Sequence, residues 1–502
     1  MTSPARMSNC ALIGLIAGTL VACGGGGGGG YGGGMTTMPA PTASFSQPAQ
    51  ALSIHYGQAL KLSWSSAYAT SCSAGVSSSA GGSFTGSRSM SGSASVVPSA
   101  PGSYTYTLAC TGMGGMVSAS TPTVTVSPSI IGALSSGGKI TTIGSTIDPI
   151  NGDQNPYGLA IAPATQGLIE SGDLVVCNFN DGPTNTQGLG TTIVGLHAVA
   201  GSKPYRIAQS ASLQGCNALT LLPDDSISAA AWMANLNPLV SASGSVQAPF
   251  ASDTFDSPWG EAYVAATASQ PAAIYVSTTP GGADNSATGA VRRISLDGDA
   301  QTSIVDIVGG FCASGAPGAI FGPAGLTYDV SSDTLYVVDT SSNSVIALTA
   351  VSAIPANGVT VNGQCGAGAV TPTPEPTFSG PSASSARVIA HGAPLSTPLS
   401  AALLPDGDLV VGNADIGVST ASNTTNLLIE VSPVLPGGFV DQPLQLDSGA
   451  PGALFGIAAA ADSGGNPVIY FNDDNAAAVL SLSMGTSSTG PTPYQANRTA
   501  RR

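Results

Sequence analysis

The sequence predicts an all-β protein in which a β-sandwich precedes a six-bladed β-propeller. Of the 502 residues, 42% are hydrophobic and only 8% are charged, while 66 Gly and 36 Pro provide many turns. This composition is typical of secreted β proteins and not of disordered chains. Short stretches of alternating polar and apolar residues recur over residues 41–128, as in half-buried strands. A unit of successive strands then recurs six times over residues 139–484.

The chain begins with a segment that predicts export. An apolar run from Ala11 to Leu20 is too short to cross a membrane and ends in Leu20-Val21-Ala22-Cys23. These four residues resemble the bacterial lipobox, in which the cysteine is lipidated and becomes the new N-terminus. The resemblance implies a signal peptide over residues 1–22, a palmitate-type lipid on Cys23 and, because Gly and not Asp follows, an outer-membrane location. An ordinary secretory signal with an incidental cysteine is the alternative.

Ten of the eleven residues after Cys23 are Gly, so residues 23–40 are expected to form a flexible tether. Residues 41–128 are expected to form the sandwich and to act as a spacer. Within them, Gly102–Cys110 resembles the late strand of immunoglobulin-like and PKD-like modules. That resemblance implies a disulfide between two sheets, packed on a buried Trp, here Trp64. Because Trp64 precedes Cys72, whereas antibody domains place the Trp between the cysteines, the topology is expected to differ from theirs.

The cysteines fit an oxidising compartment. With Cys10 in the signal and Cys23 lipidated, six remain, and an even number is typical of secreted proteins with disulfides. Six cysteines allow 15 pairings. Their division among the predicted domains favours Cys72–Cys110, Cys177–Cys216 and Cys312–Cys365.

Each repeated unit of the second region opens with an apolar strand that begins at Gly or another small residue. The first strands are expected at 158–163, 218–223, 260–264, 325–329, 400–405 and 456–460. The stretch from Gly325 to Leu348 strongly resembles an NHL repeat, which implies a propeller. The last unit lacks a fourth strand, which Lys139–Ile143 is expected to supply, so that no sheet edge is exposed. The domain boundary is expected at 129–138, and residues 485–502 are expected to be a disordered tail.

Charge is placed unevenly along the chain. The net charge is −15, and all 27 acidic residues lie at or after Asp148. A surface this negative repels nucleic acid and anionic lipid, so a nucleic-acid partner is not expected. The alternative to a functional role is that the acids simply keep an apolar surface soluble.

The candidate site is the face of the propeller where the starts of first strands and the ends of second strands converge. Its candidate residues are Asn155, Asn217, Glu261, Asp339, Asn413 and Asn472. Their oxygens could bind Ca²⁺ or sugar hydroxyls. Glu261 with Asn155, Asn217 and Asn413 resembles the metal-binding set of gluconolactonase-like propellers. The alternative is that Asn and Asp are ordinary turn residues here. The three histidines, His55, His197 and His391, lack the spacing of a zinc site.

Three functions follow from these observations. The first is a membrane-anchored envelope protein whose propeller binds a protein or a glycan without catalysis and without a cofactor. The second is a Ca²⁺-dependent hydrolase that uses the Glu261 set. The third is a purely structural envelope protein.

Overall fold

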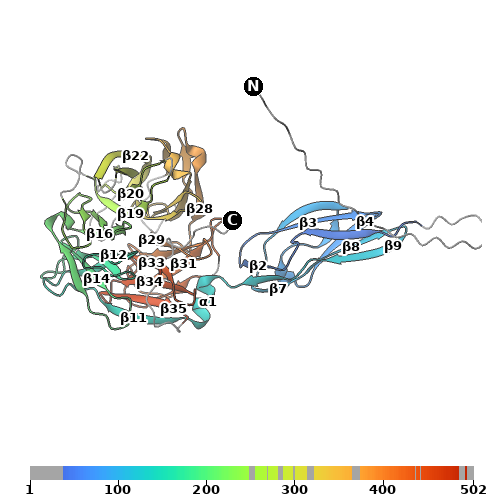
Figure 1. The fold of residues 1–502 in the computed structure, drawn as a ribbon, viewed down its shortest axis with the longest axis horizontal. Helices are drawn as coiled ribbons and strands as arrows, with labels where there is room; N and C mark the ends of the chain where they lie inside the picture. The colour runs from blue at the N-terminus through green and yellow to red at the C-terminus, as the bar shows by residue number, and fades with distance from the viewer. Residues whose placement is uncertain are drawn as a thin grey trace, which may run out of the picture.

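The computed structural model describes residues 38–247, 255–267, 270–280, 287–297, 300–313, 321–363, 374–435, 437–440, 442–484 and 492–493. The predicted signal peptide, Cys23 and most of the predicted tether lie outside these ranges. The described chain is almost entirely β, in two domains joined by the helix α1 (Ile130–Gly137) (Figure 1). Among the described residues, no helix is long and apolar enough to span a membrane.

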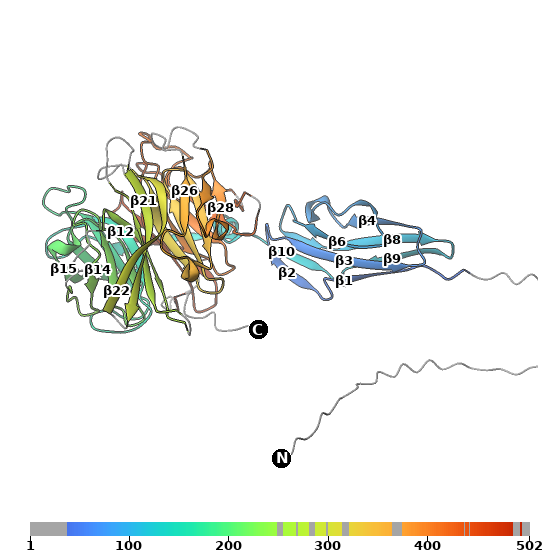
Figure 2. The ribbon, with the colours of Figure 1, turned by 90° about the horizontal axis from the view of Figure 1, so that it is seen from above.

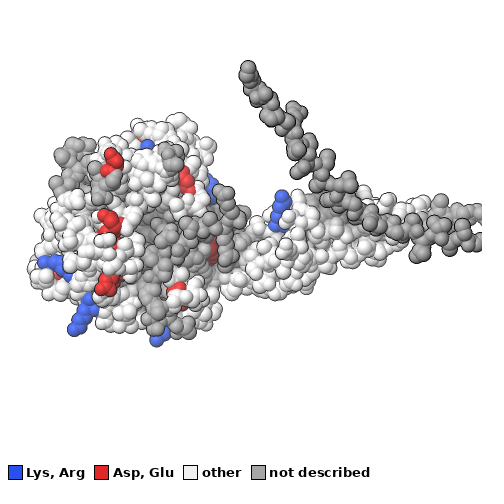
Figure 3. Space-filling view, viewed as in Figure 1, with Lys and Arg blue, Asp and Glu red and all other residues white. Residues whose placement is uncertain are grey.

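The N-terminal domain consists of ten strands in three sheets. The strands are β1 (Thr42–Gln47), β2 (Leu52–His55), β3 (Leu60–Ala67), β4 (Ser71–Val76), β5 (Gly86–Arg88), β6 (Ser91–Val96), β7 (Gly102–Tyr104), β8 (Tyr106–Gly112), β9 (Gly115–Ser120) and β10 (Val124–Ser127). The sheet orders are β1-β3-β6, β2-β10-β7 and β5-β4-β8-β9. Alternation along β3 buries Leu60, Leu62 and Trp64 in one core. Figure 2 shows this domain extending away from the C-terminal domain. In Figure 3 the Asp and Glu side chains lie on the C-terminal domain, because no acidic residue precedes Asp148.

The disulfide Cys72–Cys110 forms as predicted, but the expectation that it joins two sheets is wrong. Cys72 lies directly opposite Cys110 in the antiparallel pair β4–β8, with their Cα atoms 4.0 Å apart. The bridge therefore lies within one sheet, because the chain between the cysteines brings them back onto neighbouring strands. Trp64 does pack in the same core, and its indole N–H donates to the carbonyl of Ser89 at 2.9 Å.

The C-terminal domain is a β-propeller. Its four-stranded sheets in chain order include β12 (Gln154–Ile161), β13 (Leu174–Asn180), β14 (Thr192–Leu196), β15 (Tyr205–Gln209); β23 (Pro323–Asp329), β24 (Thr334–Asp339), β25 (Ser344–Thr349), β28 (Ala386–His391); and β29 (Pro398–Leu403), β30 (Leu409–Asn413), β31 (Leu427–Val431), β32 (Leu444–Gln445). A three-stranded sheet holds β16 (Cys216–Leu221), β17 (Ile227–Ala231) and β18 (Leu239–Val240).

Two sheets carry additional strands. One contains β19 (Pro258–Val264), β20 (Ala273–Thr278), β21 (Ala287–Asp297), β22 (Ala300–Ala313), β26 (Val359–Asn362) and β27 (Thr377–Ser379). The other contains β11 (Lys139–Ser145), β33 (Ile457–Ala461), β34 (Pro467–Asp473), β35 (Ala478–Ser483) and β36 (Thr492–Pro493). Short 3₁₀ helices lie at Ser79–Gly81, Ala211–Leu213, Val351–Ala353 and Ala383–Ser385. β36 lies in the predicted tail and pairs with β33, and the rest of that tail is outside the described residues.

The ring closes through the strand that the sequence predicts. β11 pairs antiparallel with β35, from Lys139 opposite Ser483 to Ser145 opposite Ala478. The first strands β12, β16, β19, β23, β29 and β33 contact one another in that order, and β33 contacts β12. In Figure 1 the labelled members of this set surround the middle of the domain.

Small residues in the first strands allow the sheets to meet backbone to backbone. A Cβ on Gly260 would lie 2.0 Å from the carbonyl oxygen of Ala324 in the next sheet, and one on Gly456 would lie 2.2 Å from that of Tyr157. Such distances exclude any side chain at these positions. The Gly that begins four of the six predicted units is therefore a packing requirement of the ring.

Aromatic side chains fill the middle of the propeller beside these glycines. Tyr157 stacks on Phe179 at 4.2 Å and on Phe455 at 4.0 Å between ring centroids, and Trp259 meets Tyr157 edge-on at 6.2 Å. Trp232, Ala324, Leu399 and Ala414 complete this cluster, so every sheet contributes to it. This region of the propeller is consequently apolar.

The second disulfide joins two sheets of the propeller. Cys177 of β13 bonds Cys216 of β16, which confirms the predicted pair. Cys312 takes part in a disulfide as well, while Cys365, its predicted partner, lies outside the described residues.

Helix α1 occupies the predicted boundary between the domains. The Ser129 hydroxyl caps it by accepting from the amide of Gly132 at 2.9 Å. Ile131 and Leu134 pack against the propeller residues Leu404 and Leu428. The sequence did not predict this helix, since four of its eight residues are Gly or Ser and its apolar residues are buried on the propeller surface.

Candidate functional site

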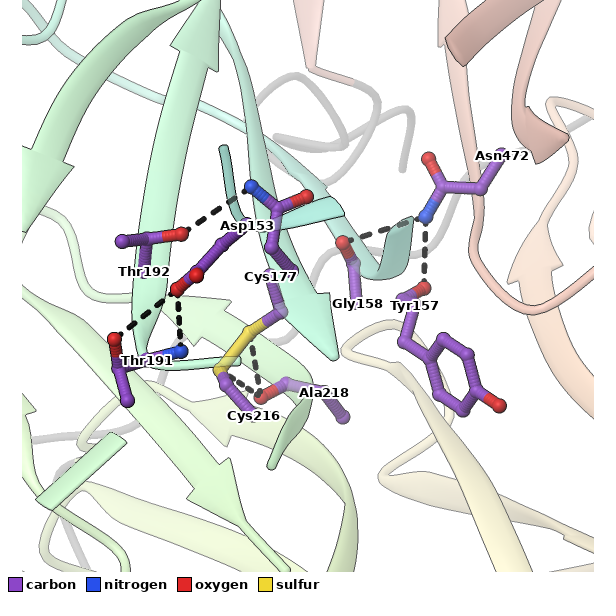
Figure 4. Close-up of a disulfide and its surroundings, with 10 residues drawn as sticks. Asp153, Tyr157, Gly158, Cys177, Thr191, Thr192, Cys216, Ala218 and Asn472 are labelled. Atoms are coloured by element: carbon purple, nitrogen blue, oxygen red, sulfur yellow. Dashed lines mark hydrogen bonds between the residues drawn. A yellow bond between two sulfur atoms is a disulfide. The ribbon is translucent and has the colours of Figure 1, made fainter. Parts of the chain in front are cut away.

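Several of the predicted site residues hold the propeller together. Asn472 at the end of β34 donates its amide to the carbonyl oxygens of Tyr157 at 2.8 Å and Gly158 at 3.4 Å, across the junction between two sheets (Figure 4). Asn413 donates to the carbonyl of Pro394 at 2.9 Å and accepts from the amide of Ser396 at 3.0 Å. These amides are engaged by the backbone.

Asp339 organises the turn after β24. Its carboxylate accepts from the amide of Ser341 at 3.1 Å, from the hydroxyl of Ser341 at 2.7 Å and from that of Ser342 at 2.5 Å. Burial raises the pKa of this carboxyl, and the serine hydrogen bonds oppose the rise. These contacts match the turn-residue interpretation of the sequence.

Glu261 lies between two sheets. Glu261 directly follows Gly260, the small residue of its first strand. The same position in three other first strands is occupied by Leu159, Leu219 and Leu326. Ser228 and Asn237 of the preceding sheet lie beside its carboxyl and lower the pKa, but burial dominates and raises that pKa to about 8. Neither Glu261 oxygen has a partner of ordinary hydrogen-bond geometry among the described residues. Glu261 is therefore a mainly protonated acid near neutral pH.

Asn217 and Asn155 lie in different surroundings. Asn217 is 4% exposed, and its amide nitrogen and oxygen have no hydrogen-bond partner within the described chain. Asn155 lines a pocket at the start of β12. Glu261 thus lies beside Ser228 and Asn237, while Asn413 bonds the segment that precedes β29. Asn155 lines the pocket, and among the described residues no hydrogen bond joins Glu261 to Asn155, Asn217 or Asn413.

The pocket at Asn155 is lined mainly by polar side chains. It encloses about 220 Å³ and is lined by Gln154, Asn155, Asn180, Asn185, Gln187, Asp474 and Ala477. Five of these seven residues carry carboxamides. They come from the start of β12, the end of β13, the following loop and the β34–β35 turn, so the pocket spans the junction where the ring closes.

Local interactions fix the loop that contributes Asn185 and Gln187. The Asp153 carboxylate accepts from the amide of Gly182 at 3.2 Å, near the start of this loop. Near the end of the loop it accepts from the amide of Thr191 at 2.7 Å (Figure 4). Asp181 accepts from the amide of Thr186 at 2.7 Å within it. These bonds tie the loop to β12 and restrict the positions that its side chains can take.

Backbone strain also positions the pocket. Asn155 has a φ of 66°, in the left-handed region that few residues other than Gly and Asn adopt. The Asn180 amide donates to the Asn185 side-chain oxygen at 2.8 Å. The side-chain oxygens of Asn155 and Asn180 are buried, and neither has a partner among the described residues. Two residues of the pocket lining therefore carry a buried acceptor that has no donor among the described residues.

The pocket has one acid and no base. Burial, and then the neighbouring Asp473, raises the pKa of Asp474 to about 7. Burial likewise raises the pKa of Tyr157 well above its usual value, with Asp474 adding to the rise and a contact with Asn155 opposing it. Carboxamides and a half-protonated acid can donate and accept hydrogen bonds, which suits hydroxyl or amide groups better than anions.

Only Asn155 of this pocket belongs to the residues that the sequence singled out as the best candidates. Asn180 and Asp474 follow second strands, as the predicted converging face requires, whereas Gln154, Asn185 and Gln187 carry no sequence signal. Their position depends on how Asp153 and Asp181 fold the loop, and no periodic pattern records that.

No protein-family model and no curated protein matches this chain. Solved structures similar to it include virginiamycin B lyase from Staphylococcus aureus, 14% identical, with a TM-score of 0.38 over 69% of this chain and 99% of that one. A calcium-binding protein, regucalcin, from Agrobacterium tumefaciens is 13% identical, with a TM-score of 0.40 over 70% of this chain and 96% of that one. A luciferin-regenerating enzyme is 10% identical, with a TM-score of 0.39 over 71% of this chain and 99% of that one. The fold assignment rests on the sheet topology of this chain, and the site on its own residues.

Proposed function

We propose that the protein is a lipid-anchored envelope protein whose propeller, of six blades, binds a neutral polyhydroxyl ligand such as a glycan end in the pocket at Asn155. Catalysis is not part of the proposal. The N-terminal domain, an immunoglobulin-like spacer in this proposal, would hold the propeller away from the membrane.

The observation that carries the binding proposal is the chemistry of the pocket lining. Each carboxamide offers two donor hydrogens and an acceptor oxygen, which matches hydroxyl groups that both donate and accept. The oxygens of Asn155 and Asn180 are buried without a partner among the described residues, so a rotation of either side chain into the pocket would let its oxygen accept from such a hydroxyl. The lining contains no Lys or Arg, so phosphate or sulfate would meet no positive charge there.

The size of the pocket limits the ligand. Its volume of about 220 Å³ is below the roughly 300–1,000 Å³ of pockets for drug-sized ligands. A single polar unit at the end of a longer chain fits this volume better than a large planar molecule does.

Calorimetric titration with maltotriose, cellotriose and chitotriose tests the proposal. At least one of these neutral sugars should bind the protein, and Asn180→Ala should weaken that binding at least tenfold because it removes both a ligand contact and the support of Asn185. Asn466→Ala, an exposed amide on another turn, should leave it unchanged. Sugar binding that Asn180→Ala does not alter would exclude this pocket.

The lipid anchor rests on Leu20-Val21-Ala22-Cys23 and the Gly-rich stretch after it. Cells expressing the protein should incorporate labelled palmitate, and Cys23→Ser should abolish the label and release the protein from the membrane fraction. Equal labelling of the Cys23→Ser variant would contradict the anchor without affecting the proposed pocket.

A further inference from the structure

One end of the N-terminal domain carries several exposed apolar side chains. The hairpin between β8 and β9 presents Met113 and Met116, which are 78% and 73% exposed. Tyr68, directly after β3, is 65% exposed, and Met38 and Met90 are exposed as well. Single exposed apolar side chains are ordinary, but a group of them in one place marks an interaction surface.

Backbone contacts bring the first of these residues together. A Cβ on Gly112 would lie 2.1 Å from the carbonyl oxygen of Tyr68, and one on Gly114 would lie 2.4 Å from that of Pro39. Gly112 and Gly114 are the neighbours of Met113. The residue after β3 and the first residues of the described chain therefore lie against the β8–β9 hairpin.

Met90 belongs to the same end of the domain. The Ser66 hydroxyl donates to the carbonyl of Met90 at 2.8 Å, and Ser66 precedes Tyr68 by two residues. Four of the six methionines in the described ranges thus lie at this end. Methionine side chains are flexible and polarisable, so they suit a partner that has no fixed shape. We call this surface the methionine tip, and it consists of Met38, Tyr68, Met90, Met113 and Met116.

The backbone at Tyr68 is unusual for an aromatic residue. Its φ is 58°, in the left-handed region where Gly, Asn and Asp are the common turn residues and bulky residues are rare. Turn formation alone therefore does not explain the choice of Tyr. An exposed tyrosine has an apolar ring and a polar hydroxyl, the combination that is enriched where a membrane meets water.

The methionine tip lies where the described chain begins. The opposite end of the domain, with β2 and β7, lies beside α1 and the propeller (Figure 1). Fourteen residues separate Cys23 from Met38. Even a fully extended chain of this length spans only roughly 50 Å, so a lipid on Cys23 would keep the methionine tip closer to the bilayer than the propeller.

The charge of the N-terminal domain favours the same partner. Its charged residues are Lys61 and Arg88, and no acidic residue precedes Asp148. A bilayer that contains anionic lipids attracts a surface with this charge. The acidic side chains, which such a bilayer repels, lie on the propeller (Figure 3).

We infer that the methionine tip is a membrane-binding surface, which inserts its methionine and tyrosine side chains into the bilayer that holds the lipid of Cys23. The inference rests on the proposed lipid anchor for the choice of membrane. A lipid on a tether limits only the distance between protein and bilayer. Contact through the tip would also fix the orientation of the N-terminal domain, with the propeller pointing away from the bilayer.

Quenching of tryptophan fluorescence tests the insertion. The natural tryptophans of the chain, at positions 64, 232 and 259, are buried, so an added Trp reports on its own position. The Met113→Trp variant of the whole protein is reconstituted into phosphatidylethanolamine–phosphatidylglycerol vesicles whose acyl chains carry bromine. The added fluorescence should fall at least twofold relative to unbrominated vesicles. Ile150→Trp, at a propeller residue that is 71% exposed, should show no such fall.

A second set of variants removes apolar surface from the methionine tip. With Tyr68→Trp as the reporter, Met113→Gln combined with Met116→Gln should reduce the quenching at least threefold. Both methionines are exposed, so the core of the domain is not altered. Leu52→Gln, an exposed apolar residue on β2 at the opposite end, is the matched control and should leave the quenching unchanged.

The outcomes separate the methionine tip from the lipid anchor. An unquenched Met113→Trp in protein that incorporates palmitate would overturn the inference and leave the anchor standing. Quenching in protein whose Cys23→Ser variant keeps its palmitate label would contradict the anchor and support the tip. A dimer in detergent that Met113→Gln with Met116→Gln dissociates, together with unquenched Trp, would overturn the inference and assign the tip to a second copy of the chain.

Discussion

The two described disulfides close loops of almost equal length but have different surroundings. Cys72–Cys110 spans 38 residues and joins neighbouring strands of one sheet, whose backbone ladder already holds them together. Cys177–Cys216 spans 39 residues and joins two sheets of the propeller that share no ladder. Loop closure alone gives both the same stabilisation, so a difference between them would measure what the surrounding structure contributes.

The comparison shows where the two domains need extra bonds. In the propeller, Cys177, Ser277 and Asn472 occupy the same place on their second strands, opposite the small residue of the first strand. Ser277 donates to the carbonyl of Ala324 at 2.6 Å, and Asn472 to that of Tyr157. One position therefore connects successive sheets, by a covalent bond at one junction and by hydrogen bonds at others.

The largest expected effect is the loss of the disulfide between sheets. Cys177→Ser with Cys216→Ser should lower the free energy of unfolding by about 4 kcal/mol, because a 39-residue loop gains that much entropy in the unfolded chain. Denaturant unfolding measures this value. Cys72→Ser with Cys110→Ser is the matched control, and an equal loss in both would show that only loop length matters.

The next largest effect is expected at Glu261, which lies between two sheets where other first strands carry Leu. Burial raises the pKa of the Glu261 carboxyl, so the folded protein keeps this proton at pH values where the unfolded chain has already lost it. The contribution of the protonated Glu261 to the free energy of unfolding is complete at low pH and is lost as the pH rises toward about 8. Glu261→Gln should remove the slope and raise the relative stability at pH 8 by on the order of 3 kcal/mol.

Thermal unfolding at pH 5 and pH 8 checks this prediction. Asp462→Asn changes a half-exposed acid in a turn and provides a comparison with less burial. A pH slope in Glu261→Gln as steep as in the unmodified protein would show that Glu261 is already ionised in the fold.

Asn472 tests the hydrogen-bonded version of the junction. Asn472→Ala should lower the free energy of unfolding by about 1–3 kcal/mol, since it leaves the buried carbonyl of Tyr157 without the amide that donates to it. Hydrogen exchange in β12 and β34 should increase, because these are the strands that the bond joins. Protection that stays the same in both strands would mean that the aromatic cluster alone holds the junction.

The smallest effect is expected at Ser277. Ser277→Ala should lower the free energy of unfolding by about 1 kcal/mol. It removes the bond that the hydroxyl donates to Ala324 and the bond that it accepts from the amide of Gly260, and the cavity that it creates is small. Urea unfolding resolves this value. A Ser277→Cys variant retains the size of the side chain, so a similar loss in it would identify the hydrogen bonds and not the volume as the cause.

The sequence predicted the features that recur. The six first strands, the closing strand at Lys139–Ile143 and two cysteine pairs depend on spacing and on short patterns, which a sequence displays directly. The in-sheet position of Cys72–Cys110 could not be predicted, because two residues 38 apart can face each other on one sheet or on two. That requires the strand order, which the sequence does not state.

The candidate site was harder to predict than the fold. Asn413 and Asn472 look like surface ligands in the sequence, but backbone carbonyls occupy their amides. The polar pocket gathers residues from the two ends of the propeller chain, Asn155 and Asp474, together with a loop that Asp153 holds in place. Only the closed ring brings them together.

Closure by β11 also has a mechanical consequence. Since β11 follows α1 directly, any tension between the N-terminal domain and the propeller is carried into the strand that completes the ring. Under such tension the β11–β35 pair bears the load that would open the ring. Single-molecule pulling on the N-terminal domain should separate β11 from β35 before any other sheet of the propeller unfolds.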